Sequence, residues 1–402
     1  LSLLPSFPRS TRLTRLRPFL SLVSGWLWYQ GENNCGGTMG NSAKFEGYGC
    51  QIVALVDGWR KLWSTGRGAA ASQLPLPFGI VTLASGGSEG HDGNMSHMRW
   101  SQTGNYGKLP NRALSNTFLA HAYDLGDPMD NLRAPCVNGS AVNASAFGPH
   151  GPCVWPAASA WNAATRPLRD TVFKNAAPSF MGGIHPRFKH EVGRRLALAF
   201  NGAQGPTIAG CALDAAAATL TLSFNVSGAD ELLLQWSPEQ FNLSTWGMSD
   251  SSSLMVCIAP PSPAGAAAAT AEDCAADPSM WQPAPLRKGA TASTLIVDLA
   301  NLVDYTATFD NRTNVTTIDV RGALLPSAKT KILAVRYGWS ISQRGGDTCC
   351  PFKTVSDGRE PCVPGSCPII TKTGSLPANP FYATIGASTN KCECLAPQTC
   401  ST

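Results

Sequence analysis

Charged side chains are scarce in this 402-residue sequence, in which Asp, Glu, Lys and Arg together make up only 14% of the residues. The net charge is +5, and beyond a short Arg-rich start the chain has no basic stripe with interleaved aromatics, so nucleic-acid binding has little support. No apolar run approaches the roughly 18 residues of a membrane-spanning helix. The sequence therefore predicts a globular protein with no nucleic-acid partner and no transmembrane segment, long enough to form two domains.

Zinc-type C-x-x-C pairs are also lacking, although the chain contains 14 cysteines. An even number of cysteines without metal-ligand spacing predicts disulfides and no metal. N-x-S/T sequons begin at Asn94, Asn138, Asn143, Asn225, Asn242, Asn311 and Asn314. Disulfides and sequons together predict a glycoprotein of the secretory pathway, either extracellular or in a lysosome or vacuole. Accidental sequons in a Ser/Thr-rich chain are the alternative.

Apolar runs and helical patterns alternate in the first half of the chain. The expected elements are strand 19–29, helix 44–66, strand 77–85, strand 116–125 and helix 185–200. Strands that alternate with helices predict an α/β domain with a parallel sheet, which we place at residues 19–204. Residues 128–178 are rich in Pro, Ala, Asn and Cys and are expected to form a surface insertion in this domain. Residues 1–18 are expected to be unstructured or wrongly assigned to the protein.

Short segments of alternating apolar and polar residues replace this pattern after about residue 205. They predict a β-rich second domain over residues 205–345. The Ala- and Pro-rich stretch 259–278 is expected to be a loop within it. Residues 346–402 are rich in cysteine and show little periodicity, which predicts an irregular C-terminal tail.

His185 is the strongest single candidate for chemistry. Pro186 suits the first turn of a helix, so His185 is expected at or near the N-cap, where the helix dipole favours a neutral imidazole. A neutral imidazole can act as a general base. Gly182 and Gly183, just before it, allow the backbone to approach a substrate closely. A capping histidine without a catalytic role is the alternative.

A polar block, WYQGENN at residues 28–34, follows directly on an apolar run. The carboxyl end of a parallel strand faces the crevice in which α/β folds bind their ligands. The side chains of Gln30 and Asn34 and the backbone amide of Gly31 could therefore donate hydrogen bonds to a developing oxyanion. A polar turn that merely ends the strand is the alternative.

These motifs together resemble one family. WYQGENN, VALVDGWRKLW, PFGIVTLAS, GGIHPRFKHEVGRRLAL and VRYGWS occur in the order seen in sialate O-acetylesterases, which are SGNH-type carbohydrate esterases. The resemblance runs from about Gly25 to Ile385. It implies a three-layer α/β/α hydrolase domain that removes acetyl groups from sugar hydroxyls without a metal or another cofactor.

The resemblance also assigns roles to individual residues. It implies that His185 is the general base, that Gln30, Gly31 and Asn34 form the oxyanion block, and that Glu32 is a structural partner of that block. Arg99, in the family-like stretch HMRWSQT, is expected to line the pocket and contact a substrate carboxylate, or alternatively to pair with an internal acid.

Two departures from the family pattern affect the catalytic groups. The family's serine nucleophile lies in a G-Q-S-N or G-D-S type motif on the first strand, and no such motif precedes Gly25. We therefore expect this chain to be a truncated form without the nucleophile and its strand. Many SGNH enzymes also have an Asp two or three residues before the histidine, and both positions are glycine here. Asp127 is the candidate to orient His185, with Asp124 or a backbone carbonyl as alternatives.

The stretch GGSEG at residues 86–90 matches the G-x-S-x-G pattern of a nucleophile elbow. An elbow runs directly into a helix, and residues 91–104 show no helical period, so we expect a flexible loop here. Ser88 is the minor alternative for the nucleophile.

The expected function is hydrolysis of acetyl esters on sialic acid or related sugars by a serine/histidine mechanism. The substrate partner would be an O-acetylated sugar or glycan. A catalytically inactive secreted protein on the same fold, with a sugar-binding or structural role, is the alternative.

Overall fold

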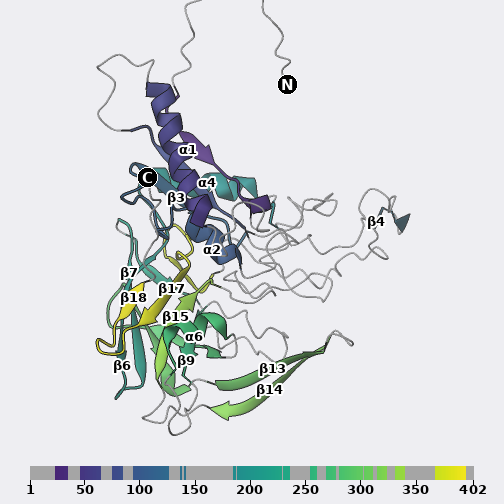
Figure 1. The fold of residues 1–402 in the computed structure, drawn as a ribbon, viewed down its shortest axis with the longest axis vertical. Coiled ribbons are helices and arrows are strands. Elements are labelled where there is room, and N and C mark those ends of the chain that lie inside the picture. Colours follow the sequence, from purple (N-terminus) through teal and green to yellow (C-terminus); the bar gives the residue numbers. More distant parts are fainter. Residues whose placement is uncertain are drawn as a thin grey trace, which may run out of the picture.

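The computed structural model describes a mixed α/β protein with several sheets (Figure 1). The described residues are 23–34, 46–64, 75–84, 94–125, 136–137, 140–141, 184–186, 188–228, 230–235, 254–259, 269–277, 280–301, 303–310, 315–323, 331–339 and 367–394. No described helix is both long and apolar enough to cross a membrane.

A small parallel sheet organises the first half of the chain. Its strands are β1 (Trp26–Trp28), β2 (Phe78–Thr82) and β3 (Thr117–His121), in the order β1-β2-β3. Both pairings are parallel, as the alternation of strands and helices predicted. Every residue of β2 and β3 is buried, which is typical of parallel strands covered on both faces. β1 is shorter than the predicted strand 19–29, since residues 23–25 are not in it.

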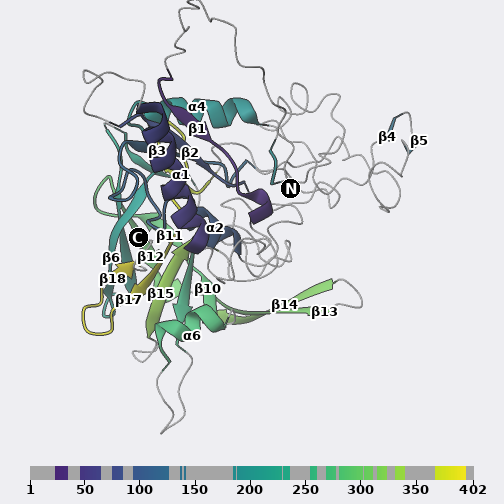
Figure 2. The same cartoon turned by 45° about the horizontal axis from the view of Figure 1, so that its top comes forward.

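Helices cover both faces of this sheet (Figure 2). α1 (Glu46–Ser64) and α2 (Asn94–Ser101) pack on one face, and α4 (Lys189–Phe200) packs on the other. On the α1 side, Trp59 contacts the rings of Trp26, Trp28 and Phe78 at centroid distances of 5.8–6.0 Å. The predicted helix 44–66 is confirmed by α1, and of its two tryptophans Trp59 packs against the core while Trp63 is 42% exposed.

Two of the helices differ from the prediction. α2 lies within residues 91–104, where we expected no helix, and that expectation is wrong. The helix is held by its tertiary contacts, because Met95 and Met98 are buried in the core while Gln102 bonds to the backbone just after β1 and β2. α4 begins at Lys189 rather than near Pro186.

The second half of the chain is rich in strands, and the predicted alternating segments coincide with strands there. These strands are β6 (Thr207–Asp214), β7 (Thr219–Asn225), β8 (Leu232–Leu234), β9 (Leu254–Ile258), β10 (Trp281–Pro283), β11 (Leu286–Lys288), β12 (Thr294–Asp298), β13 (Val303–Asp310), β14 (Val315–Ala323), β15 (Ile332–Tyr337), β16 (Ile369–Thr371), β17 (Phe381–Ile385) and β18 (Cys392–Cys394). They form a four-stranded sheet, β11-β12-β7-β6, a five-stranded sheet, β10-β9-β15-β17-β18, and the pairs β13-β14 and β16-β8. The short strands β4 (Cys136–Val137) and β5 (Ser140–Ala141) pair within the expected insertion.

The inner faces of the two larger sheets share one hydrophobic core. Leu222 of β7 and Val335 of β15 are both fully buried in it. The β13–β14 hairpin extends away from this body (Figure 2).

The C-terminal segment is more regular than predicted. β16, β17 and β18 all lie after residue 346, and β17 pairs with β15 inside the five-stranded sheet. The expectation of an irregular tail is therefore wrong for residues 369–394, because these strands pair with partners far away in the sequence. The predicted loop 259–278 likewise contains a short helix, α6 (Ala271–Ala276).

Disulfides join distant parts of the β-rich half, as the even cysteine count predicted. Cys211 of β6 bonds to Cys392 of β18, and Cys257 of β9 bonds to Cys274 of α6. The second bond ties α6 to the five-stranded sheet.

Candidate functional site

The polar block follows β1 at the carboxyl edge of the parallel sheet. Glu32–Asn34 form a single 3-10 turn, closed by a hydrogen bond from the Asn34 amide to the Gly31 carbonyl. Gly31 has φ +135°, and a Cβ at this position would collide with the methyl group of Met98. Only glycine fits this backbone without strain. The sharp turn brings Gln30 and Asn34 together.

Hydrogen bonds connect the block to both helices on its face of the sheet. The Gln30 amide donates to Asn34 Oδ1 over 2.7 Å, and Tyr48 of α1 donates to Gln30 Oε1 over 2.9 Å. Gln102, just after α2, donates to the Gln30 carbonyl over 2.9 Å. Sequence reasoning missed both Tyr48 and Gln102 as parts of the site, although Gln102 lies in the HMRWSQT stretch.

The segment that leads into α4 lies beside the polar block. The ammonium group of Lys189 is 4.4 Å from the centroid of the Tyr29 ring. Burial lowers the pKa of Lys189, and the nearby charge of Glu32 opposes this shift. Ile184 is fully buried in the same hydrophobic cluster as Tyr48. Ile184 and Lys189, which lie on either side of His185 in the sequence, therefore pack close to the end of β1.

His185 itself lies in a turn and is half-buried. The N-cap of α4 is Phe188, whose carbonyl accepts the first helical hydrogen bonds from Glu191 and Val192. His185 is thus three residues before the cap, and our placement of it at the helix N-terminus is wrong. Helical bonding starts at Phe188.

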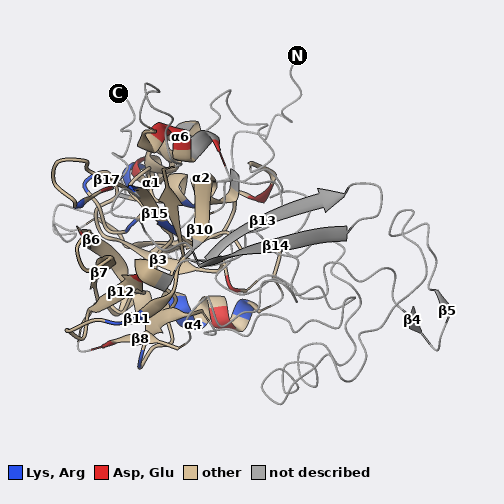
Figure 3. Cartoon of the chain, turned by 90° about the horizontal axis from the view of Figure 1, so that it is seen from below, with Lys and Arg blue, Asp and Glu red and all other residues tan. Residues whose placement is uncertain are grey.

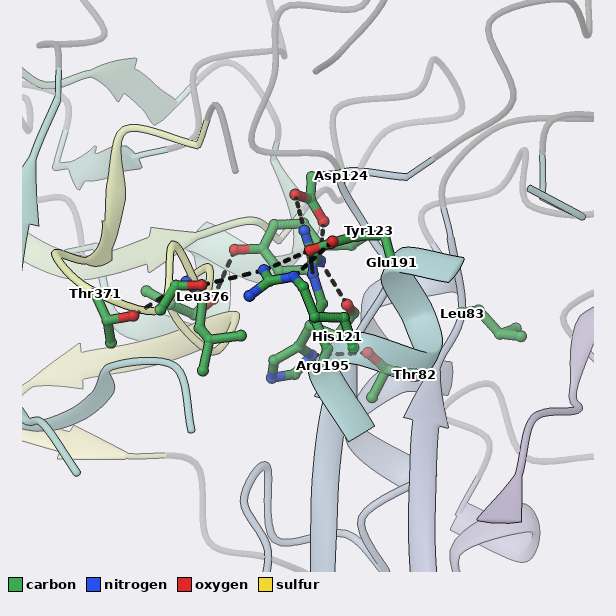
Figure 4. A network of polar contacts seen from close by, with 12 residues as sticks. Thr82, Leu83, His121, Tyr123, Asp124, Glu191, Arg195, Thr371 and Leu376 are labelled. Atoms are coloured by element: carbon green, nitrogen blue, oxygen red, sulfur yellow. Dashed lines mark hydrogen bonds and ion pairs between the residues drawn. The ribbon is translucent and has the colours of Figure 1, made fainter. Parts of the chain in front are cut away.

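Asp124, one alternative partner of His185, forms a buried ion pair with Arg195 of α4 (Figure 4). Its two oxygens accept bonds of 2.6 and 2.7 Å from the guanidinium, and both side chains are at most 1% exposed. Burial lowers the pKa of Arg195, but Asp124 and then Glu191 raise it above its ordinary value. The pair anchors the end of β3 to α4, which carries side chains of both charges (Figure 3). Asp127 and Ser88 lie outside the described residues.

Arg99 is only 2% exposed. Its Nε donates to the Leu83 carbonyl over 2.8 Å, and its guanidinium lies 5.5 Å from the ring centroid of Tyr123. These contacts tie α2 to the end of β2.

A buried histidine that the sequence did not single out joins the parallel sheet to the β-rich half. His121 at the end of β3 contacts Thr82 Oγ1 through Nδ1 and Asn379 Oδ1 through Nε2, both over 2.7 Å. Asn379 also donates through its nitrogen to the Gly107 carbonyl, which leaves its oxygen to accept from His121. The imidazole therefore carries its proton on Nε2. Burial lowers the pKa of His121 to about 4.

The chain is a mixed α/β protein whose polar block lies at the carboxyl edge of a parallel sheet, the edge at which open α/β folds commonly bind ligands. Sialate O-acetylesterases from Homo sapiens and Rattus norvegicus are 35% and 36% identical to the chain over 106 residues. The enzyme of the same name from Mus musculus is 33% identical over the same length. These matches confirm the resemblance to sialate O-acetylesterases.

The aligned segment is 26% of this chain and spans only about a fifth of the length of these curated relatives, 18–19%. No family model matches the chain.

Proposed function

We propose that this chain provides the hydrolase site of a carbohydrate O-acetylesterase that acts on acetylated sialic acid or related sugars. The observation that carries the proposal is the position of the His185 segment beside the polar block, where the ammonium group of Lys189 lies over the ring of Tyr29 and is influenced by the charge of Glu32. An ester hydrolase needs a base and oxyanion donors around one reacting carbonyl. The sialate O-acetylesterase relatives support this reaction and an acetylated sugar as substrate.

In the proposed reaction a serine hydroxyl attacks the acetyl carbonyl and His185 takes its proton. The carbonyl electron pair moves to oxygen, and Gly31 and Asn34 donate hydrogen bonds to that oxyanion, each worth about 3 kcal/mol. Gln30, expected as a third donor, instead donates its amide to Asn34. The bond to the sugar oxygen then breaks, and the proton passes from His185 to this leaving group. Water then attacks the acetyl group on the serine, with His185 again as the base. Acetate leaves, and the serine hydroxyl regains its proton from His185. Asp127 is the proposed partner of His185, since Asp124 binds Arg195.

The serine nucleophile is proposed to lie on a further strand that pairs with the outer edge of β1, which would complete a three-layer α/β/α domain. Among the described strands, β1 pairs with β2 alone. Leu27 in β1 is 63% exposed, and its side chain lies over Gly79 of β2, next to Phe118. Phe118 in turn contacts Phe200 of α4, which is 61% exposed. A strand followed by a helix would cover this apolar face.

We also propose the domain division near residue 204 and a glycosylated, secretory protein. α4 ends at Phe200 and the β-rich half begins with Thr207, which supports the division. The disulfides are compatible with the secretory pathway. Asn225 is exposed at the end of β7, where a glycan would meet solvent.

Acetate release from O-acetylated sialic acid tests the proposal. The 402-residue chain alone is expected to release little acetate, whereas the polypeptide extended by its upstream reading frame is expected to be active. His185→Ala in the extended protein should abolish the release, and His190→Ala, on the exposed face of α4, should leave it unchanged. Activity that survives His185→Ala would refute the proposed base. A fluorophosphonate label on Ser88 in the chain alone would instead favour GGSEG as the nucleophile elbow. An inactive extended protein would favour a sugar-binding role.

A further inference from the structure

A row of hydrogen bonds runs from the core of the parallel sheet to the polar block. The indole Nε1 of Trp28 donates to the hydroxyl of Tyr48 over 3.4 Å, and that hydroxyl donates to Gln30 Oε1 over 2.9 Å. The amide nitrogen of Gln30 then donates to Asn34 Oδ1 over 2.7 Å. Four side chains from β1, α1 and the turn are thus joined in sequence.

The chemistry of these groups gives the row one direction. An indole N–H can only donate, so the oxygen of Tyr48 accepts and its proton points toward Gln30, whose side-chain Oε1 at 2.9 Å is nearer than its backbone carbonyl at 3.1 Å. Because Gln30 Oε1 accepts, its nitrogen is the donor to Asn34. Asn34 Oδ1 is thereby occupied as an acceptor, and its Nδ2 group becomes the donor at the end of the row. Successive bonds of this kind polarise one another, which strengthens the last donor.

A second set of bonds fixes the backbone that carries this row. Gln102 is fully buried, and its Nε2 donates to the carbonyl of Gln30 over 2.9 Å and to that of Val81 over 3.2 Å. Its Oε1 accepts from the amide of Leu83 over 3.0 Å. One amide side chain therefore clamps the carboxyl ends of β1 and β2 at a fixed spacing. The turn at Gly31 follows immediately on this clamp.

We propose that Tyr48 is a positioning residue for the oxyanion donors, and that it acts by directing the Gln30 amide so that Asn34 presents Nδ2 to the substrate. Gln102 holds the backbone of the same turn. This inference rests on the proposed function, because it needs an oxyanion at Gly31 and Asn34. A donor held in place before the substrate arrives stabilises the transition state without a cost of reorganisation.

Titration of the chain with acetate tests this inference without a nucleophile. Acetate offers a carboxylate oxygen to the same donors, and nuclear magnetic resonance follows the backbone amide of Gly31 and the side-chain amide of Asn34. Tyr48→Phe removes one hydroxyl and keeps the ring, and should raise the acetate dissociation constant roughly three- to tenfold. Trp28→Phe should give a smaller rise in the same direction.

Tyr123→Phe is the matched control. It also removes one buried hydroxyl, whose bond to the Ala378 carbonyl is 2.6 Å long, but it lies outside the row, so acetate binding should not change. Thermal unfolding of each variant separates general loss of stability from loss of the donors. If Tyr48→Phe fails to fold, the acetate dissociation constant of Trp28→Phe tests the inference in its place.

The possible failures are distinguishable. A wild-type chain whose Gly31 and Asn34 signals do not respond to acetate would contradict the proposed function and remove the basis of the inference. A wild-type chain that responds, together with folded variants at Tyr48 and Trp28 that bind acetate equally well, would overturn the positioning role alone.

Discussion

Mild acid should destabilise the protein through His121. The imidazole is buried between Thr82 and Asn379, and the positive charges of Arg99 and Arg195 disfavour its protonation while Asp124 favours it. Only the neutral ring donates through one nitrogen and accepts through the other, as these two partners require. A proton on Nδ1 would remove the acceptor that Thr82 uses.

The magnitude follows from the pKa values of the two states. Burial lowers the pKa of His121 in the folded protein to about 4, from an ordinary value of 6.5. Between these values the unfolded chain binds a proton and the folded chain does not, so stability falls as the pH falls. The contribution is fully present above about pH 6.5 and is lost by about pH 4, and the total loss is about 3 kcal/mol.

Urea unfolding, followed by tryptophan fluorescence at several pH values, measures this loss. His121→Gln cannot titrate, so its unfolding free energy should depend less on pH between about 6.5 and 4, although it is less stable at neutral pH. His190→Gln, an exposed site, should keep the pH dependence of the wild type. Equal pH dependence in the wild type and in His121→Gln would refute the reasoning.

Three further perturbations have expected effects on stability. Asp124→Asn leaves the buried guanidinium of Arg195 without its counter-charge and should lower the unfolding free energy by about 3–5 kcal/mol, measured by urea unfolding. Replacement of both Cys257 and Cys274 by serine opens a link across 17 residues and should lower the unfolding free energy by about 3 kcal/mol, measured by urea unfolding without a reductant so that the Cys211–Cys392 bond stays intact. Gly31→Ala forces a side chain into a φ of +135° against the core and should cost about 1–3 kcal/mol, visible as a lower midpoint of thermal unfolding.

Two substitutions at exposed positions serve as controls for these stability effects. Lys372→Gln breaks an ion pair with Glu231 whose side chains are 60% and 56% exposed, and should cause no measurable change. Gly58→Ala, on the surface of α1 with no neighbour near the added methyl group, should not destabilise the protein. A loss at Lys372 as large as that at Asp124, or a Gly31→Ala variant as stable as Gly58→Ala, would contradict the account.

The sequence predicted helices and strands correctly where the local pattern of apolar residues matches the residues that are buried. β2 and β3 are continuous apolar runs, and α1 carries its buried residues Ile52 and Val56 on one face, so all three were predictable. α2 was not, because it is short and polar and is stabilised by partners elsewhere in the chain. The start of α4 was misplaced because Pro186 suits a first helical turn but lies in the turn before it.

Pairings between distant residues were beyond prediction from the sequence. β17 is a run of five residues whose strand character depends on β15 and β18. His121 and Asn379 are separated by 258 positions, and neither has a local signal that points to the other. Within the candidate site, the sequence indicated Gln30 and Asn34, but Tyr48 appeared only as a core residue of a helix. Its role depends on a hydroxyl whose partners lie on other elements.

The central claim is that His185 and the polar block face one crevice. The most direct measurement follows the imidazole Cε1 signal of His185 and the backbone amide signal of Gly31 during one acetate titration at constant pH, with His185→Ala used to assign the imidazole. The account predicts that both signals shift along one saturation curve with the same dissociation constant. A Gly31 signal that saturates while that of His185 stays unchanged would contradict it.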